Sequence, residues 1–246
     1  TKHNWATGDT KLPTSYSSGG VSNPFNSGTM REIHISQKNS ELGAYWRNTL
    51  HFEDSSWTWM PNFRSEYYTA TKEFLPLPRL ATRYALTETL GLRAATGLYG
   101  QPPHAQELDK DFGNPNVKAP KAIHGAAGFE KSFQGTALNG LVFSSGLFYR
   151  HFYDLVVPST RVTTVGGVPT AENYNNEGKG RAFGAEALIK YNAKPWMGWV
   201  AYTLSRSYRT NPDQPEYLFS YDQTHLLTLI GSVELPKNWV LSSRFR

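Results

Sequence analysis

The sequence predicts an all-β protein, an antiparallel transmembrane β-barrel, and three observations favour this fold class. Short polar connections alternate with long ones along most of the chain. Strand-like segments carry apolar residues at every second position, with charged residues between them. Tryptophans lie near the short connections. Together these features are typical of outer-membrane barrels, which have short periplasmic turns, long extracellular loops and aromatic girdles.

The spacing of the connections carries the most weight. Short connections are expected at Glu53–Ser56, Thr87–Thr89, Gln134–Thr136, Ala193–Pro195 and Pro236–Asn238. Long connections are expected over 66–77, 101–119, 155–178 and 208–222, and most exceed the roughly 2–5 residues of a usual hairpin. Within 155–178, Gly166 and Gly167 predict the turn of a small hairpin.

About ten membrane-crossing strands are predicted between these connections. They lie near 31–53, 56–68, 77–87, 90–100, 120–132, 138–154, 179–192, 196–207, 222–235 and 239–246. The first is longer than the roughly 9–11 residues that cross a bilayer, so part of it should project outward. Pro61 in the second indicates a bulge or an unpaired position.

Two regions follow from this pattern. Residues 1–30, rich in Gly, Ser, Asn and Thr, are expected to form an extracellular loop or the end of a preceding barrel segment. Residues 31–246 are expected to form a partial β-barrel domain, with no plug domain present.

Alternation divides each strand into two faces. In 90–99, Leu92 lies on an apolar face and Arg93 on the opposite one. A charge against lipid at the bilayer midplane costs about 2–4 kcal/mol, so the charged face should line the lumen. A soluble β-sandwich also alternates, but it does not account for the alternation of short and long connections. The lumen-facing charges predicted in this way are Arg83, Arg93, Glu186, Lys190 and Arg244.

The tryptophans indicate an interfacial belt at the end with short turns. Those within a few residues of a short connection are Trp57, Trp59, Trp196, Trp199 and Trp239. Packing of aromatic rings across hairpins is an alternative explanation. Trp199 also falls on the face of the predicted lumen charges, which a belt does not explain.

Composition excludes several function classes. The net charge is +5, but the Lys and Arg residues are scattered, so no nucleic-acid partner is expected. There is no Cys and no paired His spacing, so neither a metal site nor a cofactor is expected. The mean hydropathy of −0.52 suits a barrel wall, which needs apolar residues at alternate positions only. Because the chain begins without Met or a signal segment, we expect a mature or trimmed product.

Six segments follow one another in the predicted strands and loops: 42–48 (LGAYWRN), 78–80 (PRL), 92–97 (LRAATG), 113–120 (GNPNVKAP), 176–186 (NEGKGRAFGAE) and 219–225 (FSYDQTH). In this order they resemble the C-terminal part of the barrel of a TonB-dependent outer-membrane receptor. The resemblance covers residues from about 31 to the end. It implies a barrel of about 22 strands with a plugged lumen, of which this chain would supply about ten.

The resemblance also departs from the family pattern. No segment looks like a plug domain or like the short segment that engages TonB, and the chain stops inside a strand at Arg244-Phe245-Arg246. We therefore expect an internal piece of a longer receptor.

The function implied by the resemblance is TonB-coupled uptake of a scarce nutrient, without enzymatic chemistry, in the bacterial outer membrane. The nutrient would be an iron chelate, cobalamin or an oligosaccharide. Implied partners are TonB, through a plug domain, and the bilayer with its lipopolysaccharide. A passive porin or structural barrel is the first alternative. The residues expected to bind substrate, in an extracellular vestibule, are Tyr99, Phe112, Tyr153, Tyr174, Tyr208 and Tyr217.

A barrel enzyme that uses Asp222 is the second alternative. Asp222 and His225 form the nearest acid–base couple, but positions i and i+3 of a strand face opposite ways unless a bulge intervenes. The segment 109–114 faintly resembles a calcium loop, but it lacks the remaining acidic positions and the closing Glu. Turn formation by its Asp, Gly and Asn residues explains it better.

Overall fold

The computed structural model describes residues 2–13, 30–52, 55–110, 113–135, 138–165, 167–212 and 214–246. The strands are β1 (Lys2–Pro13), β2 (Met30–Arg47), β3 (Leu50–His51), β4 (Trp57–Tyr68), β5 (Glu73–Ala85), β6 (Leu90–Gly100), β7 (Lys121–Phe133), β8 (Leu141–Pro158), β9 (Val162–Val165), β10 (Val168–Ala171), β11 (Tyr174–Ala193), β12 (Trp196–Thr210), β13 (Tyr217–Leu218), β14 (His225–Leu235) and β15 (Trp239–Phe245). A short 3₁₀ turn, η1 (Pro236–Asn238), joins the last two. None of the described residues forms a helix long and apolar enough to cross a membrane.

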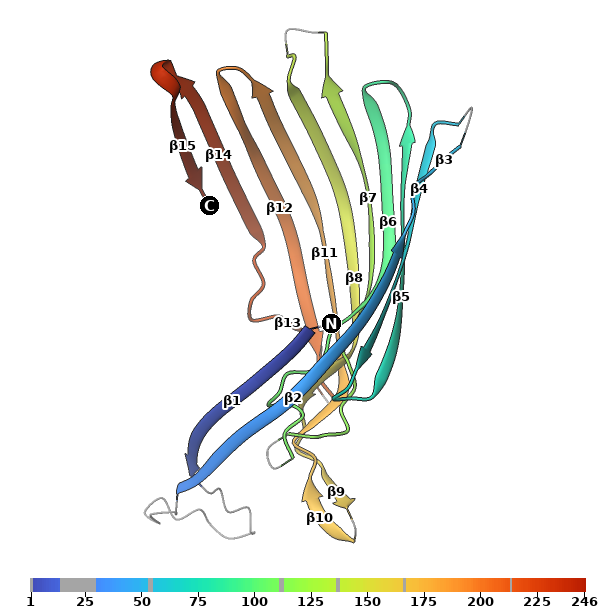
Figure 1. The fold of residues 1–246 in the computed structure, drawn as a ribbon, viewed down its shortest axis with the longest axis vertical. Coiled ribbons are helices and arrows are strands. Elements are labelled where there is room, and N and C mark those ends of the chain that lie inside the picture. Colours follow the sequence, from blue (N-terminus) through green and yellow to red (C-terminus); the bar gives the residue numbers. More distant parts are fainter. Residues whose placement is uncertain are drawn as a thin grey trace.

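The strands form one antiparallel, thirteen-stranded sheet in nearly sequential order. The path runs β1-β2-β4-β5-β6-β7-β8-β11-β12-β14-β15, with β3 paired to β4 and β13 paired to β12. The sheet curves into an open trough (Figure 1). Its edge strands, β1 and β15, do not pair with each other, so the described sheet is a partial barrel wall.

All ten predicted strands are present, and the structure adds one more at the N-terminal side. Strand β1 occupies residues for which the pattern indicated a loop or the end of a preceding barrel segment, and it pairs with β2 along its whole length. The predicted hairpin is confirmed: β9 and β10 pair with each other as a separate two-stranded sheet. Gly167 has φ of 84° at its turn, a conformation that glycine adopts without strain.

The expected long connection over 66–77 is wrong. Strand β4 ends at Tyr68 and β5 begins at Glu73, so a short turn joins them. Pro76 and Pro78 lie within β5, and β6 pairs with β5 only from Arg79 onward. The prolines therefore sit on a stretch with one unpaired side, where a missing N–H costs no ladder hydrogen bond.

Pro61 is unpaired on one side and causes no bulge. The register between β4 and β5 continues through Pro61 and Leu80 without a shift. On its other side β2 pairs from Asn62 and β3 only as far as Trp59. The carbonyl of Pro61 still accepts a hydrogen bond, at 3.1 Å, from the N–H of Asn48.

The register assigns every side chain to one of two faces, because directly paired residues of neighbouring strands lie on the same side of a sheet. We call one side the inner face, and it is defined by a row of paired residues: Arg83, Arg93, Gly128, Gly146, Glu186 and Thr203. The outer face is defined by the adjacent row: Tyr84, Leu92, Phe129, Ser145, Ala187 and Tyr202.

The two faces differ as a membrane wall requires. Large apolar side chains of the outer face are open to the surroundings, with Leu92 43%, Leu147 67% and Leu204 43% exposed. The inner face is hollowed by a groove of about 610 Å³. Small inner-face residues line it: Ala81, Ala95, Ala126, Ser144 and Ala201. Arg83, Arg93 and Glu186 line the same groove. Large apolar side chains on one face, with charged and small residues on the other, are the arrangement of a barrel wall in lipid.

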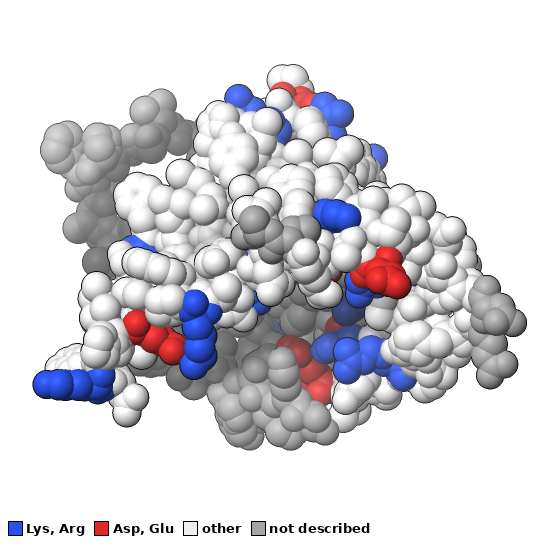
Figure 2. Space-filling view, turned by 90° about the horizontal axis from the view of Figure 1, so that it is seen from above, with Lys and Arg blue, Asp and Glu red and all other residues white. Residues whose placement is uncertain are grey.

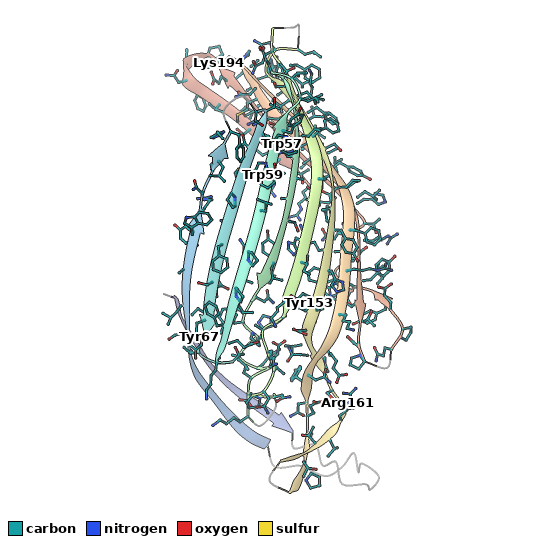
Figure 3. All side chains as sticks on the ribbon, turned by 90° about the vertical axis from the view of Figure 1, so that its right-hand side faces the viewer. Trp57, Trp59, Tyr67, Tyr153, Arg161 and Lys194 are labelled. Atoms are coloured by element: carbon teal, nitrogen blue, oxygen red, sulfur yellow. The ribbon has the colours of Figure 1, made fainter. Side chains whose placement is uncertain are left out.

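The two ends of the sheet also differ. Figure 3 places Trp57, Trp59 and Lys194 at the end with the short turns, and Tyr67 and Arg161 toward the end with long connections. Viewed from the end with short turns, the charged groups are small and separated by uncharged surface (Figure 2). By the rule that barrels keep short turns in the periplasm, the loop 101–120 and the β9–β10 hairpin lie at the extracellular end.

Two neighbouring alanines of β6 provide a matched test of the faces. Ala94 pairs with Ala127 on the outer face, and Ala95 pairs with Ala126 on the inner face. We expect Ala94→Arg to impair assembly by about 2–4 kcal/mol, because it places a charge against lipid near the midplane. Ala95→Arg should assemble. The yield of heat-modifiable barrel in outer-membrane fractions measures the difference, and equal yields would contradict the assignment of the faces.

Candidate functional site

The register places the five charged residues predicted to face the lumen on the same side of the sheet. Arg83 pairs with Arg93, and the register carries this row to Glu186. A second row joins Lys190 to Arg244 through Trp199 and Ile230. Trp199 therefore shares the face of the charges, as its position in the alternation indicated, and does not belong to an outward-facing belt.

Glu130 neutralises part of the arginine charge near the centre of the wall. Its carboxylate lies 3.4 Å from Arg93 Nη1 and 4.0 Å from Arg83 Nη2. The sequence pattern did not single out Glu130. A signal was present, because Glu130 occupies an inner-face position of its own strand and pairs with Gly91, next to Arg93.

Nearer the extracellular end, arginine and aromatic side chains stack in a continuous strip across the inner face. Arg79 Cζ lies 4.1 Å from the Tyr99 ring centroid, and Tyr99 stacks on His124 at 4.1 Å. His124 meets Phe152 edge-on at 6.4 Å. Arg209 Cζ then lies 4.7 Å from the Phe152 ring and 4.1 Å from the Phe219 ring. The arginine–aromatic strip consists of Arg79, Tyr99, His124, Phe152, Arg209 and Phe219.

Two glycines allow the arginines of the strip to lie flat against the wall. A methyl group at Gly97 would lie 2.7 Å from Arg79 Cγ, and one at Gly180 would lie 2.9 Å from Arg209 Cδ. Both distances are shorter than van der Waals contact. The missing side chains therefore let Arg79 lean over β6 and Arg209 lean over β11.

The strip is cationic and has no carboxylate partner among the described residues. None of their ion pairs involves Arg79, Arg209 or Arg150, whose Cζ lies 5.0 Å from the Phe148 ring beside the strip. Arg79 Nε is buried without a hydrogen-bond partner. Arg209 Nη1 donates to neutral oxygens only, the Ser207 hydroxyl at 3.1 Å and the Tyr208 carbonyl at 2.9 Å.

The structure does not bring the predicted vestibule residues together. Tyr99 belongs to the strip, whereas Tyr208 lies on the outer face, paired with Arg181 and stacked on Phe183 at 6.3 Å. Tyr153 stacks on His151, with the ring centroids 6.2 Å apart. His151 pairs with Arg181 on the outer face. Phe112 lies outside the described residues.

The last two predicted residues lie in connecting segments at the extracellular end. Tyr174 begins β11, and its backbone carbonyl accepts a hydrogen bond from the loop 101–120. Tyr217 is in β13, with its hydroxyl 3.4 Å from Asn211 Oδ1. Tyr217 pairs with Arg209 of the arginine–aromatic strip across the β12–β13 ladder. No described interaction joins Tyr174 to the strip.

The loop 101–120 folds back onto the sheet at this end. Ala119 is fully buried against Tyr68, Leu75 and Leu77, which are themselves almost completely buried. The backbone N–H of Ala119 donates to Glu73 Oε2 at 2.7 Å. Since Leu75 and Leu77 share the inner face with Arg79, the loop packs over the lumen side of the wall, beside the strip.

Asparagine side chains fasten the loop to β11. Asn176 Nδ2 donates to the carbonyls of Lys118 and Asp154, both at 2.8 Å, and Asn176 Oδ1 accepts from the Lys118 N–H at 2.7 Å. Asn114 Nδ2 donates to the Tyr174 carbonyl at 2.7 Å. Two of the segments that carried the family resemblance, 113–120 and 176–186, are thus in direct contact.

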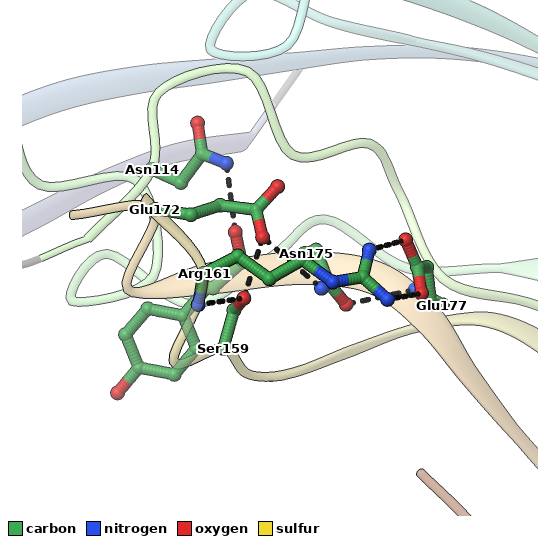
Figure 4. A network of polar contacts seen from close by, with 7 residues as sticks. Asn114, Ser159, Arg161, Glu172, Asn175 and Glu177 are labelled. Carbon is green, nitrogen blue, oxygen red and sulfur yellow. Dashed lines mark hydrogen bonds and ion pairs between the residues drawn. The ribbon is translucent and has the colours of Figure 1, made fainter. Parts of the chain in front are cut away.

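A polar network at the start of β11 supports this attachment (Figure 4). Ser159 donates to Glu172 Oε2 at 2.5 Å, and Asn175 Nδ2 donates to the same oxygen at 3.2 Å. Arg161 and Glu177 form a two-pronged ion pair, with 2.8 Å between Nη2 and Oε2. These contacts connect the segment between β8 and β11 to the first residues of β11.

Asp222 and His225 do not form an acid–base couple. Asp222 Oδ1 accepts from the Ser207 N–H at 2.6 Å, and its other oxygen accepts from Thr224 at 3.1 Å. His225 Nδ1 lies 2.8 Å from the Tyr202 hydroxyl. Within the described part of the chain, no three His, Asp or Glu side chains gather closely enough to hold a metal ion.

Comparison with known protein families identifies the barrel to which this wall belongs. The family model for the β-barrel of TonB-dependent receptor-like proteins matches residues 2–244. The chain belongs to the TonB-dependent receptor family. Its barrel wall is therefore an outer-membrane structure, and the family is one of receptors and transporters, not of enzymes. No curated protein matches the chain.

Solved structures with the same fold include three receptors of low sequence identity. The ferric-catecholate import receptor Fiu of Escherichia coli K12 has a TM-score of 0.64 at 15% identity, covering 84% of this chain and 34% of its own. The Pseudomonas aeruginosa pyoverdine receptor FpvA has 0.61 at 16%, covering 83% and 30%. The P. aeruginosa ferric enterobactin receptor PfeA has 0.60 at 15%, covering 85% and 40%. The chain thus spans about a third of the length of these receptors.

We expect Asn176→Ala to loosen the loop 101–120. It removes three hydrogen bonds, each worth about 1 kcal/mol. Trypsin should then cleave the folded, detergent-solubilised receptor after Lys118 faster than in the wild type. Asn116→Ala is the matched control, since Asn116 lies exposed in the same loop and only its backbone N–H is bonded there. Equal cleavage rates in the two variants would contradict the role of Asn176.

Proposed function

We propose that this chain forms part of the wall of a receptor that takes up a scarce nutrient by TonB-coupled transport. Residues 31–246 would be a partial barrel domain, and residues 1–30 a loop or the end of a preceding barrel segment. Coupling to TonB would pass through a plug domain in the lumen. The outer face would contact the bilayer and its lipopolysaccharide.

The arginine–aromatic strip is the observation that best supports a receptor. A passive channel needs only a hydrated lumen, whereas here six side chains stack in fixed positions below an extracellular rim. Aromatic rings with charged groups between them provide both flat contact area and hydrogen-bond donors for a small molecule. The loop 101–120, fastened beside the strip, would narrow the entrance to that surface.

An iron chelate is the nutrient that we propose first. Fiu imports ferric catecholates, FpvA was solved with pyoverdine bound, and PfeA is a receptor for ferric enterobactin. At 15–16% identity these receptors support the fold more than the ligand, so cobalamin and oligosaccharides are tested in parallel.

Energy dependence separates this proposal from a passive porin. The full-length receptor would be expressed in a Gram-negative host that lacks its own siderophore and cobalamin receptors. We expect accumulation of radiolabelled ferric enterobactin, ferric pyoverdine or cyanocobalamin above the vector control, and loss of that accumulation when tonB is deleted.

Two results would count against TonB-coupled uptake. Accumulation that persists without TonB would indicate a passive channel, and so would steady ion conductance of the purified receptor in planar bilayers. An unrelated TonB-dependent receptor in the same host serves as the control for the energy supply.

A further inference from the structure

Arg79 and Arg209 of the strip, and Arg150 beside it, have no acidic partner among the described residues, whereas several other arginines of the wall are paired. Arg93 lies 3.4 Å from Glu130, Arg181 is 2.6 Å from Glu216, and Arg206 is 3.5 Å from Asp222. Arg79, Arg150 and Arg209 contact aromatic rings instead. A guanidinium that stacks through its flat face keeps its N–H edge free to donate to another group. Three guanidinium groups without a carboxylate partner, on neighbouring inner-face positions, concentrate positive charge.

The glycines direct two of these charges toward each other. Arg79 leaves β5, crosses Gly97 and stacks on Tyr99 of β6, while Arg209 leaves β12, crosses Gly180 and stacks on Phe152 of β8. Strands β6 and β8 are separated by β7 alone, so Arg79 and Arg209 stack on rings of nearby strands. The rings of Tyr99, His124 and Phe152 fill the space between them.

We propose that the arginine–aromatic strip is the part of the binding surface that selects a negatively charged ligand. The ligand would be a small molecule with anionic oxygen groups on or near a flat ring. Its oxygens would accept hydrogen bonds from Arg79 and Arg209, and its ring would lie against the aromatic side chains between them. This assignment rests on the proposed uptake function and narrows it, since neutral and cationic molecules would be rejected at the strip.

Charge provides the selectivity because the described residues around the strip supply no counterion to Arg79 or Arg209. Charge-assisted hydrogen bonds to anionic oxygens are stronger than neutral ones, and the planar guanidinium matches a carboxylate or phosphate in a bidentate manner. A neutral ring of the same shape would keep the stacking and lose this contribution. Because the strip is partly exposed, added salt should weaken the attraction on the scale of the Debye length, about 10 Å at 0.1 M.

Flavin mononucleotide and riboflavin make a matched pair of probes. They share one flat, fluorescent ring system and differ only by a phosphate group. Binding to the purified full-length receptor in detergent would be followed by fluorescence anisotropy at low and high salt. We expect flavin mononucleotide to bind at least tenfold more tightly than riboflavin, and the difference to shrink as salt is raised.

Variants connect this selectivity to the strip. Arg79→Gln and Arg209→Gln should each weaken flavin mononucleotide binding at least fivefold and leave riboflavin binding unchanged. Gly97→Ala should act in the same direction, because the added methyl group displaces Arg79. Arg206→Gln is the control: it removes a charge from the same strand as Arg209, but on the outer face, and should change neither affinity. Heat-modifiability of each variant verifies that it is folded.

Three results would overturn the assignment: equal affinity of the wild type for the two probes, no binding of flavin mononucleotide, or binding that the strip variants leave unchanged.

The outcome of the binding experiment is separable from that of the uptake experiment. Selective anion binding without TonB-dependent accumulation would retain the strip as an anion site and refute the transport function. TonB-dependent accumulation of a nutrient by a receptor that binds the two probes equally would retain the transport function and refute the anion site.

Discussion

The pairing of every backbone N–H and C=O is the constraint on which the rest of this structure depends. In hydrocarbon an unpaired group costs several kcal/mol, so strands can cross a membrane only as a continuous sheet. Eleven strands from β1 to β15 satisfy this requirement through one antiparallel ladder after another. Strands β1 and β15 each have one free edge, and in a bilayer these edges must be paired by further strands of a larger barrel.

Continuous pairing fixes the register, and the register sorts the chemistry onto two sides. A shift of one residue in any strand would turn Arg93 or Glu186 toward lipid, at a cost of about 2–4 kcal/mol near the midplane. The outer face is consequently apolar around the midplane, where Leu92 and Leu147 lie, and the inner face is free to carry charges, glycines and rings. The arginine–aromatic strip depends on this freedom, since Arg79 and Arg209 cross neighbouring strands at positions where only a glycine leaves room.

The sequence predicted the fold well because alternation and turn spacing are local signals. The ten strands and the β9–β10 hairpin follow from residues close together in the chain, whereas β1 lacks a clear alternation and was missed. The strip could not be predicted. Its members come from β5, β6, β7, β8, β12 and the segment after β13, and only the register shows that Tyr99 joins it while Tyr208 faces outward. The contact of Glu130 with Arg83 and Arg93 likewise follows only from the pairing between strands.

Spin-label accessibility along β6 tests the division into two faces most directly. The chain has no Cys, so single cysteines at successive positions from 91 to 99 can be labelled without interference from this part of the receptor. In the full-length receptor in liposomes, collision with oxygen should be high at positions 92, 94 and 96 and low at 93, 95 and 97. Collision with a water-soluble nickel chelate should show the opposite order or stay low throughout. Oxygen accessibility without a two-residue period, or with the odd positions favoured, would contradict the account.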